Sequence, residues 1–160
     1  MKSKIVDADT LCQIVEKQKQ NGKKIVATSG CFDILHAGHV TYLEAASGKG
    51  DIFILFLNSD SSVRALKGQT RPIVPEQERA VVVAGLECVD YVCIFNEVTP
   101  CQMIEKVKPD SFIKGGDYEG KRIPEMDVMD TYGGKVEYVM MVDGCSTTNI
   151  IEKILKTVEA

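Results

Sequence analysis

Short apolar segments alternate along this chain with longer segments in which apolar residues recur every three or four positions. The short segments predict strands at residues 24–29, 52–57, 91–95, 111–113 and 136–142. Residues 52–57 are apolar at every position, which is typical of a central parallel strand covered by helices on both faces. Helical spacing predicts helices at 9–20, 37–46, 75–86, 100–107 and 125–132, and a last helix that begins near Ser146.

This alternation predicts an α/β fold, with a Rossmann-like, doubly wound parallel sheet and right-handed crossovers. The chain shows no linker, internal repeat or low-complexity stretch, so we expect one domain over residues 1–160. Its N-terminal helix would cover about 8–21 and its core about 24–158. Ligands of such sheets bind outside the carboxyl ends of the strands, where the strand order reverses. We therefore expect the chemistry in loops 30–39, 58–75 and 114–122, joined by the start of the last helix.

Composition narrows the classes of partner. The 160 residues are 44% apolar and 26% charged, as in an ordinary globular domain. The net charge of -4 argues against a general nucleic-acid-binding role, which favours a basic surface. The longest apolar run falls well short of the roughly 20 residues that a membrane-spanning helix needs. We expect neither a nucleic-acid partner nor a membrane partner.

The six cysteines include no Cys-x-x-Cys pair and no zinc-ribbon spacing. The N-terminal residues lack the apolar segment of a secretory signal peptide. Free thiols in a reducing compartment are the simplest interpretation, and we expect a cytoplasmic protein.

The first candidate motif is the loop from Gly30 to His39. It leaves a predicted strand and enters a predicted helix, so free backbone N–H groups and the positive end of the helix favour a bound phosphate. Gly30 allows close approach of the backbone, and Gly38 leaves room beside His36 and His39, the two histidines of the chain. Their spacing places both on one side of the first helical turn.

Three other interpretations of this loop are weaker. The histidines could be structural polar residues, or they could bind a metal, but no third ligand stands at a recognisable spacing. Cys31 could be a nucleophile, although no acidic partner for a catalytic triad is evident. Phosphate binding fits the loop best.

A second motif, Asp143 to Ile150, places Ser146, Thr147 and Thr148 at the start of the last helix. Their hydroxyl and N–H groups could bind a second phosphate cluster, and helix capping alone would also explain them. A third group consists of four cations, Arg64, Lys67, Arg71 and Arg79. In an acidic protein, cations gathered beside a phosphate loop favour anion binding over a solvated charged face.

The segment Lys114 to Tyr118 follows a predicted strand and supplies a cation, a glycine turn and a carboxylate. Asp117 could hold a ribose hydroxyl or lie in the turn without a ligand. The sequence leaves these alternatives open.

Together, these motifs resemble the cytidylyltransferase-like branch of the nucleotidyltransferase superfamily, over about residues 24–154. Within it, the chain is most similar to the adenylyltransferase domain of ADP-heptose synthase, on the segments 58–60, 66–68 and 114–118. Two segments depart from that pattern. Residues 46–50 replace the usual Ala-Arg helix ending, and Ile123-Pro124-Glu125-Met126 lacks the small residues typical after the isoleucine.

The resemblance implies condensation of ATP with D-glycero-β-D-manno-heptose 1-phosphate, giving ADP-heptose and pyrophosphate. The alternatives are a cytidylyltransferase acting on glycerol 3-phosphate or a related polyol phosphate, and a nucleotide-binding sensor without turnover. The expected cofactor is Mg²⁺, carried mainly by the triphosphate, with no protein ligand to the metal. We also expect a homodimer. The family often fuses this domain to a sugar kinase, and because the domain stands alone here, we expect the kinase to be a separate protein.

The resemblance also implies roles for individual residues. The catalytic set is His36, His39 and Lys67. The nucleotide would contact Gly30, Cys31, Phe32, His36, Gly38, His39, Lys114, Gly116, Asp117, Ser146, Thr147 and Thr148. The sugar phosphate would contact Asp33, Asn58, Asp60, Lys67, Arg71 and Arg79.

Overall fold

The five strands form one parallel sheet. The computed structural model describes residues 2–159 and contains β1 (Ile25–Gly30), β2 (Ile52–Asn58), β3 (Tyr91–Phe95), β4 (Ser111–Gly115) and β5 (Lys135–Val139). The sheet order is β3-β2-β1-β4-β5, so the chain runs outward from β1 and then returns to its other side as β4. This arrangement confirms the predicted fold and places the reversal of strand order between β1 and β4.

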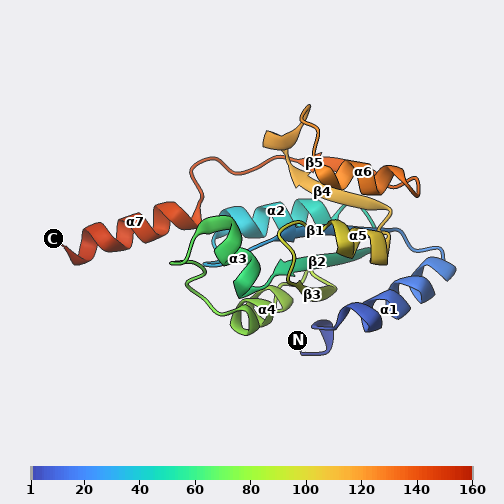
Figure 1. Cartoon of the computed structure of the whole chain (residues 1–160), viewed down its shortest axis with the longest axis horizontal. Coiled ribbons are helices and arrows are strands. Elements are labelled where there is room, and N and C mark those ends of the chain that lie inside the picture. Colours follow the sequence, from blue (N-terminus) through green and yellow to red (C-terminus); the bar gives the residue numbers. More distant parts are fainter. Residues whose placement is uncertain (1, 160) are drawn as a thin grey trace.

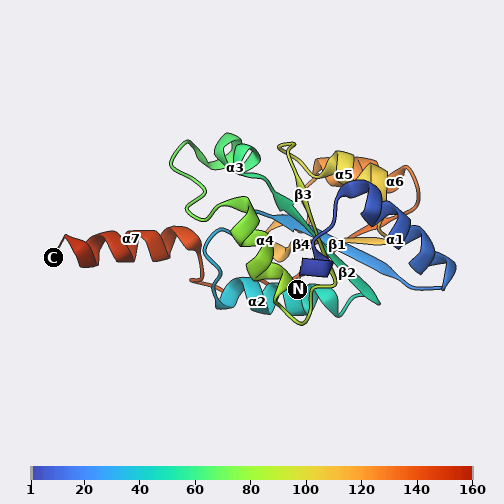
Figure 2. The same cartoon turned by 90° about the horizontal axis from the view of Figure 1, so that it is seen from below.

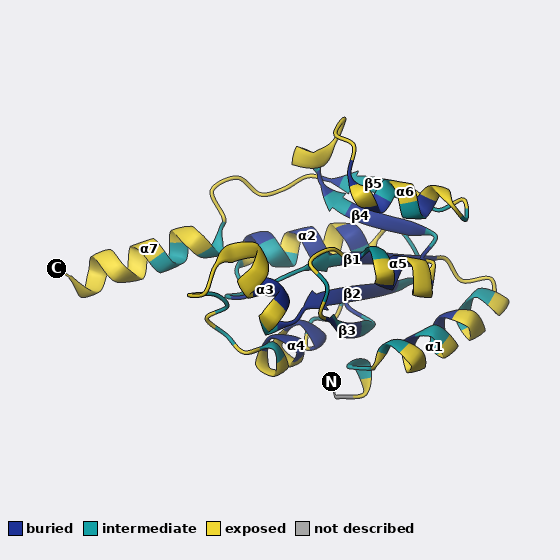
Figure 3. Cartoon of the chain, viewed as in Figure 1, coloured by how far each residue is buried: buried dark blue, intermediate teal, exposed yellow. Residues whose placement is uncertain are grey.

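Helices cover both faces of the sheet (Figures 1 and 2). One face packs against α2 (Ala37–Ser47) and α4 (Glu76–Ala84). The other packs against α1 (Ala8–Gln20), α5 (Cys101–Val107) and α6 (Pro124–Asp130). Alternate side chains of β2 enter the two cores, Leu55 on the first face and Ile54 on the second. This double burial explains why the strand is apolar throughout (Figure 3).

One helix was absent from the sequence-based prediction, which treated 58–75 as a loop. The structure forms α3 (Asp60–Lys67) there, capped by the Ser59 hydroxyl, which accepts a hydrogen bond from the Ser62 N–H at 3.2 Å. Among its apolar residues only Val63 is fully buried, while Leu66 is 47% exposed. So short an apolar face gives little periodic signal in the sequence. The start of the helix is instead stabilised by the Ser59 cap.

The last strand is shorter than predicted. β5 ends at Val139, and Met140 to Val142 lie outside the sheet, with Met140 87% exposed. The last helix, α7 (Thr147–Val158), begins where expected and projects away from the sheet (Figures 1 and 3). Two 3₁₀ turns, η1 (Lys2–Lys4) and η2 (Gly116–Tyr118), complete the fold. Within residues 2–159, no helix is long and apolar enough to cross a membrane.

Candidate active site

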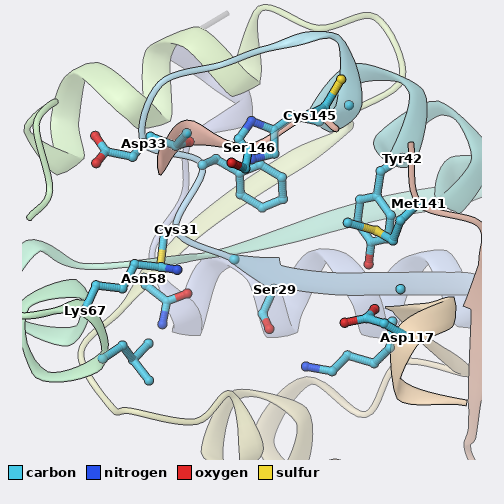
Figure 4. A pocket seen from close by; sticks show the side chains of 18 of the residues that line it. Ser29, Cys31, Asp33, Tyr42, Asn58, Lys67, Asp117, Met141, Cys145 and Ser146 are labelled. Atoms are coloured by element: carbon cyan, nitrogen blue, oxygen red, sulfur yellow. The ribbon is translucent and has the colours of Figure 1, made fainter. Parts of the chain in front are cut away.

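A cavity of about 590 Å³ opens at the carboxyl edge of the sheet, beside the reversal of strand order. Figure 4 shows Cys31, Asn58 and Lys67 on one side of it, and Tyr42, Asp117 and Met141 on the other. Most of the predicted site residues line this cavity: Gly30, Cys31, Phe32, Asp33, His36, Gly38, His39, Asn58, Lys67, Arg71, Lys114, Asp117, Ser146, Thr147 and Thr148. Segments from four different loops therefore meet at one site.

The two histidines form a stacked pair at the start of α2. Their ring centroids are 3.8 Å apart with an interplanar angle of 21°, and Phe32 packs against His39 at 5.1 Å. Among residues 2–159, the buried Nδ1 atoms of His36 and His39 find no hydrogen-bond partner. Buried polar atoms in native proteins are usually hydrogen-bonded, so these two nitrogens lack the partner that a folded protein normally provides, while other atoms of both residues line the cavity.

Both imidazoles are held in the neutral form. Burial lowers the pKa of His36. Burial, with help from the neighbouring His36, lowers the pKa of His39 to about 4. A neutral imidazole carries one N–H donor and one acceptor nitrogen. At neutral pH each ring is therefore uncharged and can donate one hydrogen bond to a phosphate oxygen.

The start of α7 lies over the histidines. The Ser146 hydroxyl caps this helix by accepting from the Asn149 N–H at 3.0 Å, and the Thr147 hydroxyl donates to Ile34 O at 3.3 Å. A Cβ on Gly38 would come within 2.7 Å of the Cys145 Cβ. Gly38 therefore permits the close contact that brings the hydroxyls of α7 to the cavity. Capping and ligand binding are compatible here.

Asp33 ties the first loop to the basic segment. Its carboxylate accepts hydrogen bonds from Arg71 Nε at 2.7 Å, from the Ile73 N–H at 2.9 Å and from the Val74 N–H at 2.8 Å. Burial alone would raise the pKa of Asp33, but these donors lower it overall, so the group stays ionised. Asp33 lines the cavity, yet its oxygens are committed to the protein. Its role is to hold residues 71–74 in place, which differs from the predicted contact with the sugar phosphate.

Arg79 and Asp60 do not line the cavity, so their predicted contact with the sugar phosphate gains no support from this structure and stays a prediction. Arg79 is 1% exposed. Its guanidinium donates to the carbonyl oxygens of Val74, Cys31 and Asn58 and to Asp60 Oδ1, the last at 2.8 Å. Arg79 therefore joins the ends of β1 and β2 to α4 from below the site, and Asp60 is its anionic partner.

Lys67 and Cys31 lie on the same side of the cavity as Asn58 (Figure 4). In the described part of the chain, no carboxylate lies within ion-pair distance of Lys67, so its ammonium is available to an anion. Burial raises the pKa of the Cys31 thiol, despite the nearby charges of Lys67 and Arg79. A thiol that stays protonated is a poor nucleophile, which argues against covalent catalysis by Cys31.

The opposite side of the cavity is formed at the end of β4. Lys114 Nζ lies 3.1 Å from Glu125 Oε1 and 4.7 Å from the centroid of the Tyr118 ring. Asp117 lines the same side. The predicted nucleotide-binding residue Gly116 begins η2 behind this wall and is not part of the cavity lining.

Comparison with known proteins identifies the family. Residues 27–153 match the family model described as cytidylyltransferase-like. The chain belongs to this family. This membership confirms the predicted class of enzyme, a nucleotidyltransferase.

Curated relatives of this family member are longer proteins. The bifunctional protein HldE of Geobacter metallireducens is 54% identical over 154 residues, which cover 96% of this chain and 31% of that protein. The protein of the same name from Wolinella succinogenes is 46% identical over 151 residues, or 94% of this chain and 31% of that protein. The chain thus spans about a third of the length of these relatives.

A solved structure shares the fold of this family member. The lipopolysaccharide core biosynthesis protein from Thermoplasma volcanium has a TM-score of 0.62 and 29% sequence identity. The match covers 76% of this chain and 98% of that one.

Several residues that line the cavity were not among the predicted site residues, and Tyr42 and Glu125 are two of them. Tyr42 lies three residues after His39 on α2, a helical spacing that could have indicated it. Its hydroxyl lies 2.7 Å from Thr28 Oγ1 and 3.0 Å from Ile113 O, and burial raises its pKa to about 12. Glu125 lies in the segment 123–126, one of the two that depart from the expected family pattern, and this departure could have marked it as a candidate site residue.

Among residues 2–159, no cluster of three or more His, Cys, Asp or Glu side chains has the arrangement of a metal site.

Proposed function

We propose that this chain transfers an adenylyl group from ATP to D-glycero-β-D-manno-heptose 1-phosphate and releases pyrophosphate. The observation that carries the proposal is the stacked pair of neutral histidines, His36 and His39, at the start of α2. Both residues line the cavity, at the helix end that favours anions. A direct transfer between two phosphate-bearing substrates needs this kind of preorganised donor.

The choice of substrates rests on resemblance. The segments 58–60, 66–68 and 114–118 favour the heptose branch of the family and ATP as the nucleotide. Relatives named HldE, about half identical over most of this chain, support a role in ADP-heptose biosynthesis.

In the proposed reaction, an oxygen of the sugar 1-phosphate attacks the α-phosphorus of ATP. A new P–O bond forms there, and the bond to the oxygen that bridges the α- and β-phosphates breaks. The attacking phosphate is already ionised at neutral pH, so no side chain has to remove a proton. The protein then acts through positioning and through stabilisation of developing charge.

Different residues of the cavity bind different phosphate groups in this proposal. His36 and His39 donate hydrogen bonds to the oxygens around the α-phosphorus and the leaving group. Lys67 and Arg71 bind phosphate oxygens, and the start of α7 holds the β- and γ-phosphates through Ser146, Thr147 and Thr148. Mg²⁺ bound to the triphosphate supplies further neutralisation of charge.

The test is release of pyrophosphate, measured with ATP alone and with ATP plus the sugar 1-phosphate. We expect release only when both substrates are present, because the cavity offers sites for two phosphate groups. Equal release from ATP alone would indicate a hydrolase, and binding of ATP with no release under any condition would indicate a sensor.

A further inference from the structure

The β4 side of the cavity contains an ion pair that is largely removed from solvent. The side chains of Lys114 and Glu125 are 17% and 6% exposed, and their charged atoms are 3.1 Å apart. Both residues line the cavity. Because the carboxylate compensates the ammonium at close range, this side presents polar atoms with little net charge.

The other side of the cavity differs in charge. Lys67 lies there with no carboxylate within ion-pair distance among residues 2–159, and the two histidines also line the cavity. The triphosphate and the attacking phosphate are attracted to the Lys67 side and to the helix N-termini. A phosphate at the β4 side would meet the Glu125 carboxylate beside the Lys114 ammonium, so its attraction to Lys114 would be largely offset.

A second carboxylate strengthens this contrast. Asp117 lines the β4 side, and a Cβ on Gly115 would come within 2.6 Å of its Oδ1. The glycine therefore lets Asp117 fold closely over the end of β4. Two carboxylates and one ammonium form an unfavourable site for an anion, but each of them makes strong, charge-assisted hydrogen bonds with hydroxyl groups.

We propose that Lys114 and Glu125 form a subsite that binds adjacent hydroxyl groups of a substrate, with Glu125 as a specificity-determining residue. A hydroxyl group donates to the carboxylate while accepting from the ammonium, which matches what the pair offers. The hydroxyls come either from the ribose of the nucleotide or from the sugar of the second substrate. The inference rests on the proposed function, and it assigns Lys114 to hydroxyl binding.

Equilibrium binding to wild type and to Glu125→Gln tests the proposal. The nucleotide arm compares ATP with 2′,3′-dideoxy-ATP, the sugar arm compares a sugar 1-phosphate with its dideoxy analogue, and tripolyphosphate is the probe without hydroxyls. In one arm, we expect wild type to prefer the hydroxyl-bearing ligand by about tenfold or more, since hydrogen bonds to charged groups have this strength. Glu125→Gln should lose that preference, and the arm in which it is lost identifies the source of the hydroxyls.

Tripolyphosphate distinguishes this role from a structural one. Glu125→Gln should bind it at least as tightly as wild type does, because removal of the carboxylate leaves the Lys114 charge uncompensated. A merely structural defect would weaken the binding of every probe. The matched control is Asp127→Asn, on the same helix, whose exposed carboxylate pairs with Arg122 outside the cavity. It should leave every affinity unchanged.

Preserved discrimination in both arms, or weaker binding of every probe, would overturn the proposal. If Glu125→Gln fails to fold, the double variant Lys114→Met with Glu125→Leu removes both charges and leaves no buried charge unpaired. It should show the same loss of discrimination. These binding measurements require no turnover. A wild-type protein that releases no pyrophosphate would refute the proposed function. The comparison of ligand affinities between wild type and Glu125→Gln would still decide the role of Glu125.

Discussion

Asp33 and Arg71, which are 38 positions apart in the sequence, form an ion pair of 2.7 Å at the rim of the cavity. The side chain of Asp33 is 1% exposed and that of Arg71 is 13% exposed. The pair joins the loop after β1 to the segment that follows α3. The position of Arg71 in the cavity wall thus depends on a carboxylate whose two oxygens already accept hydrogen bonds from the protein.

Asp33→Asn should lower kcat/KM by about tenfold or more, mainly through a higher KM for the sugar phosphate. The amide removes the charge and presents N–H groups to the donors of Ile73 and Val74, so residues 71–74 lose their anchor. Steady-state kinetics with each substrate varied in turn measures the effect. An unchanged KM for both substrates in a folded variant would show that this anchor does not position a ligand.

His39→Ala should lower kcat by about 100-fold or more with little loss of folding stability, because it removes a donor aimed at developing charge. His39→Asn retains an N–H donor and should keep part of the activity. Turnover is compared at saturating substrates, with thermal melting as the check on folding. Near wild-type turnover in folded His39→Ala would refute the assigned role.

The depressed pKa of His39 makes stability depend on pH. The group titrates near 4 in the folded protein and near 6.5 in the unfolded chain, so the unfolded chain binds more protons between these values. The free energy of unfolding therefore rises with pH across this window, and the contribution is lost as pH falls from 6.5 to about 4. Urea unfolding of wild type and His39→Asn between these pH values measures it. The variant should show the shallower dependence, and equal slopes would contradict the assignment.

Arg79→Met should destabilise the fold by about 3–5 kcal/mol, because it leaves Asp60 and three carbonyl oxygens without their donor. Chemical denaturation measures the change. Arg122→Ala is the control, because it removes an arginine whose ion pair with Asp127 is exposed, and its effect should be small. An Arg79→Met variant that is as stable as wild type but unable to bind phosphate substrates would indicate that Arg79 contacts a substrate phosphate.

The strands and most helices could be predicted because each carries a periodic or continuous apolar pattern. The run 52–57 identified the central strand, and the helix pattern of 9–20 matched α1 closely. α3 escaped detection because its buried apolar face is essentially Val63, and the end of β5 was misjudged because Met140 to Val142 are apolar but exposed. Local composition does not reveal whether an apolar residue is covered.

The cavity could be predicted in outline because loops after parallel strands meet at one edge of the sheet. What the sequence could not show is which charges are already neutralised by a partner. Arg79, Arg71 and Lys114 look alike in a sequence, yet Arg79 is buried outside the cavity lining and Lys114 is paired with Glu125, while Arg71 uses only its Nε for Asp33 and still lines the cavity. These pairings depend on contacts between distant segments, and they decide which cations can bind an anion.

The central claim is tested most directly by following the label of [α-³²P]ATP and [α-³²P]CTP into products, with heptose 1-phosphate or glycerol 3-phosphate as the acceptor. We predict that label from ATP enters ADP-heptose, with kcat/KM at least about 100-fold higher for the heptose than for glycerol 3-phosphate, because unpaired polar groups penalise the smaller acceptor. Preferred formation of CDP-glycerol from CTP would contradict the heptose assignment. Failure to label any sugar or polyol nucleotide would contradict the transferase itself.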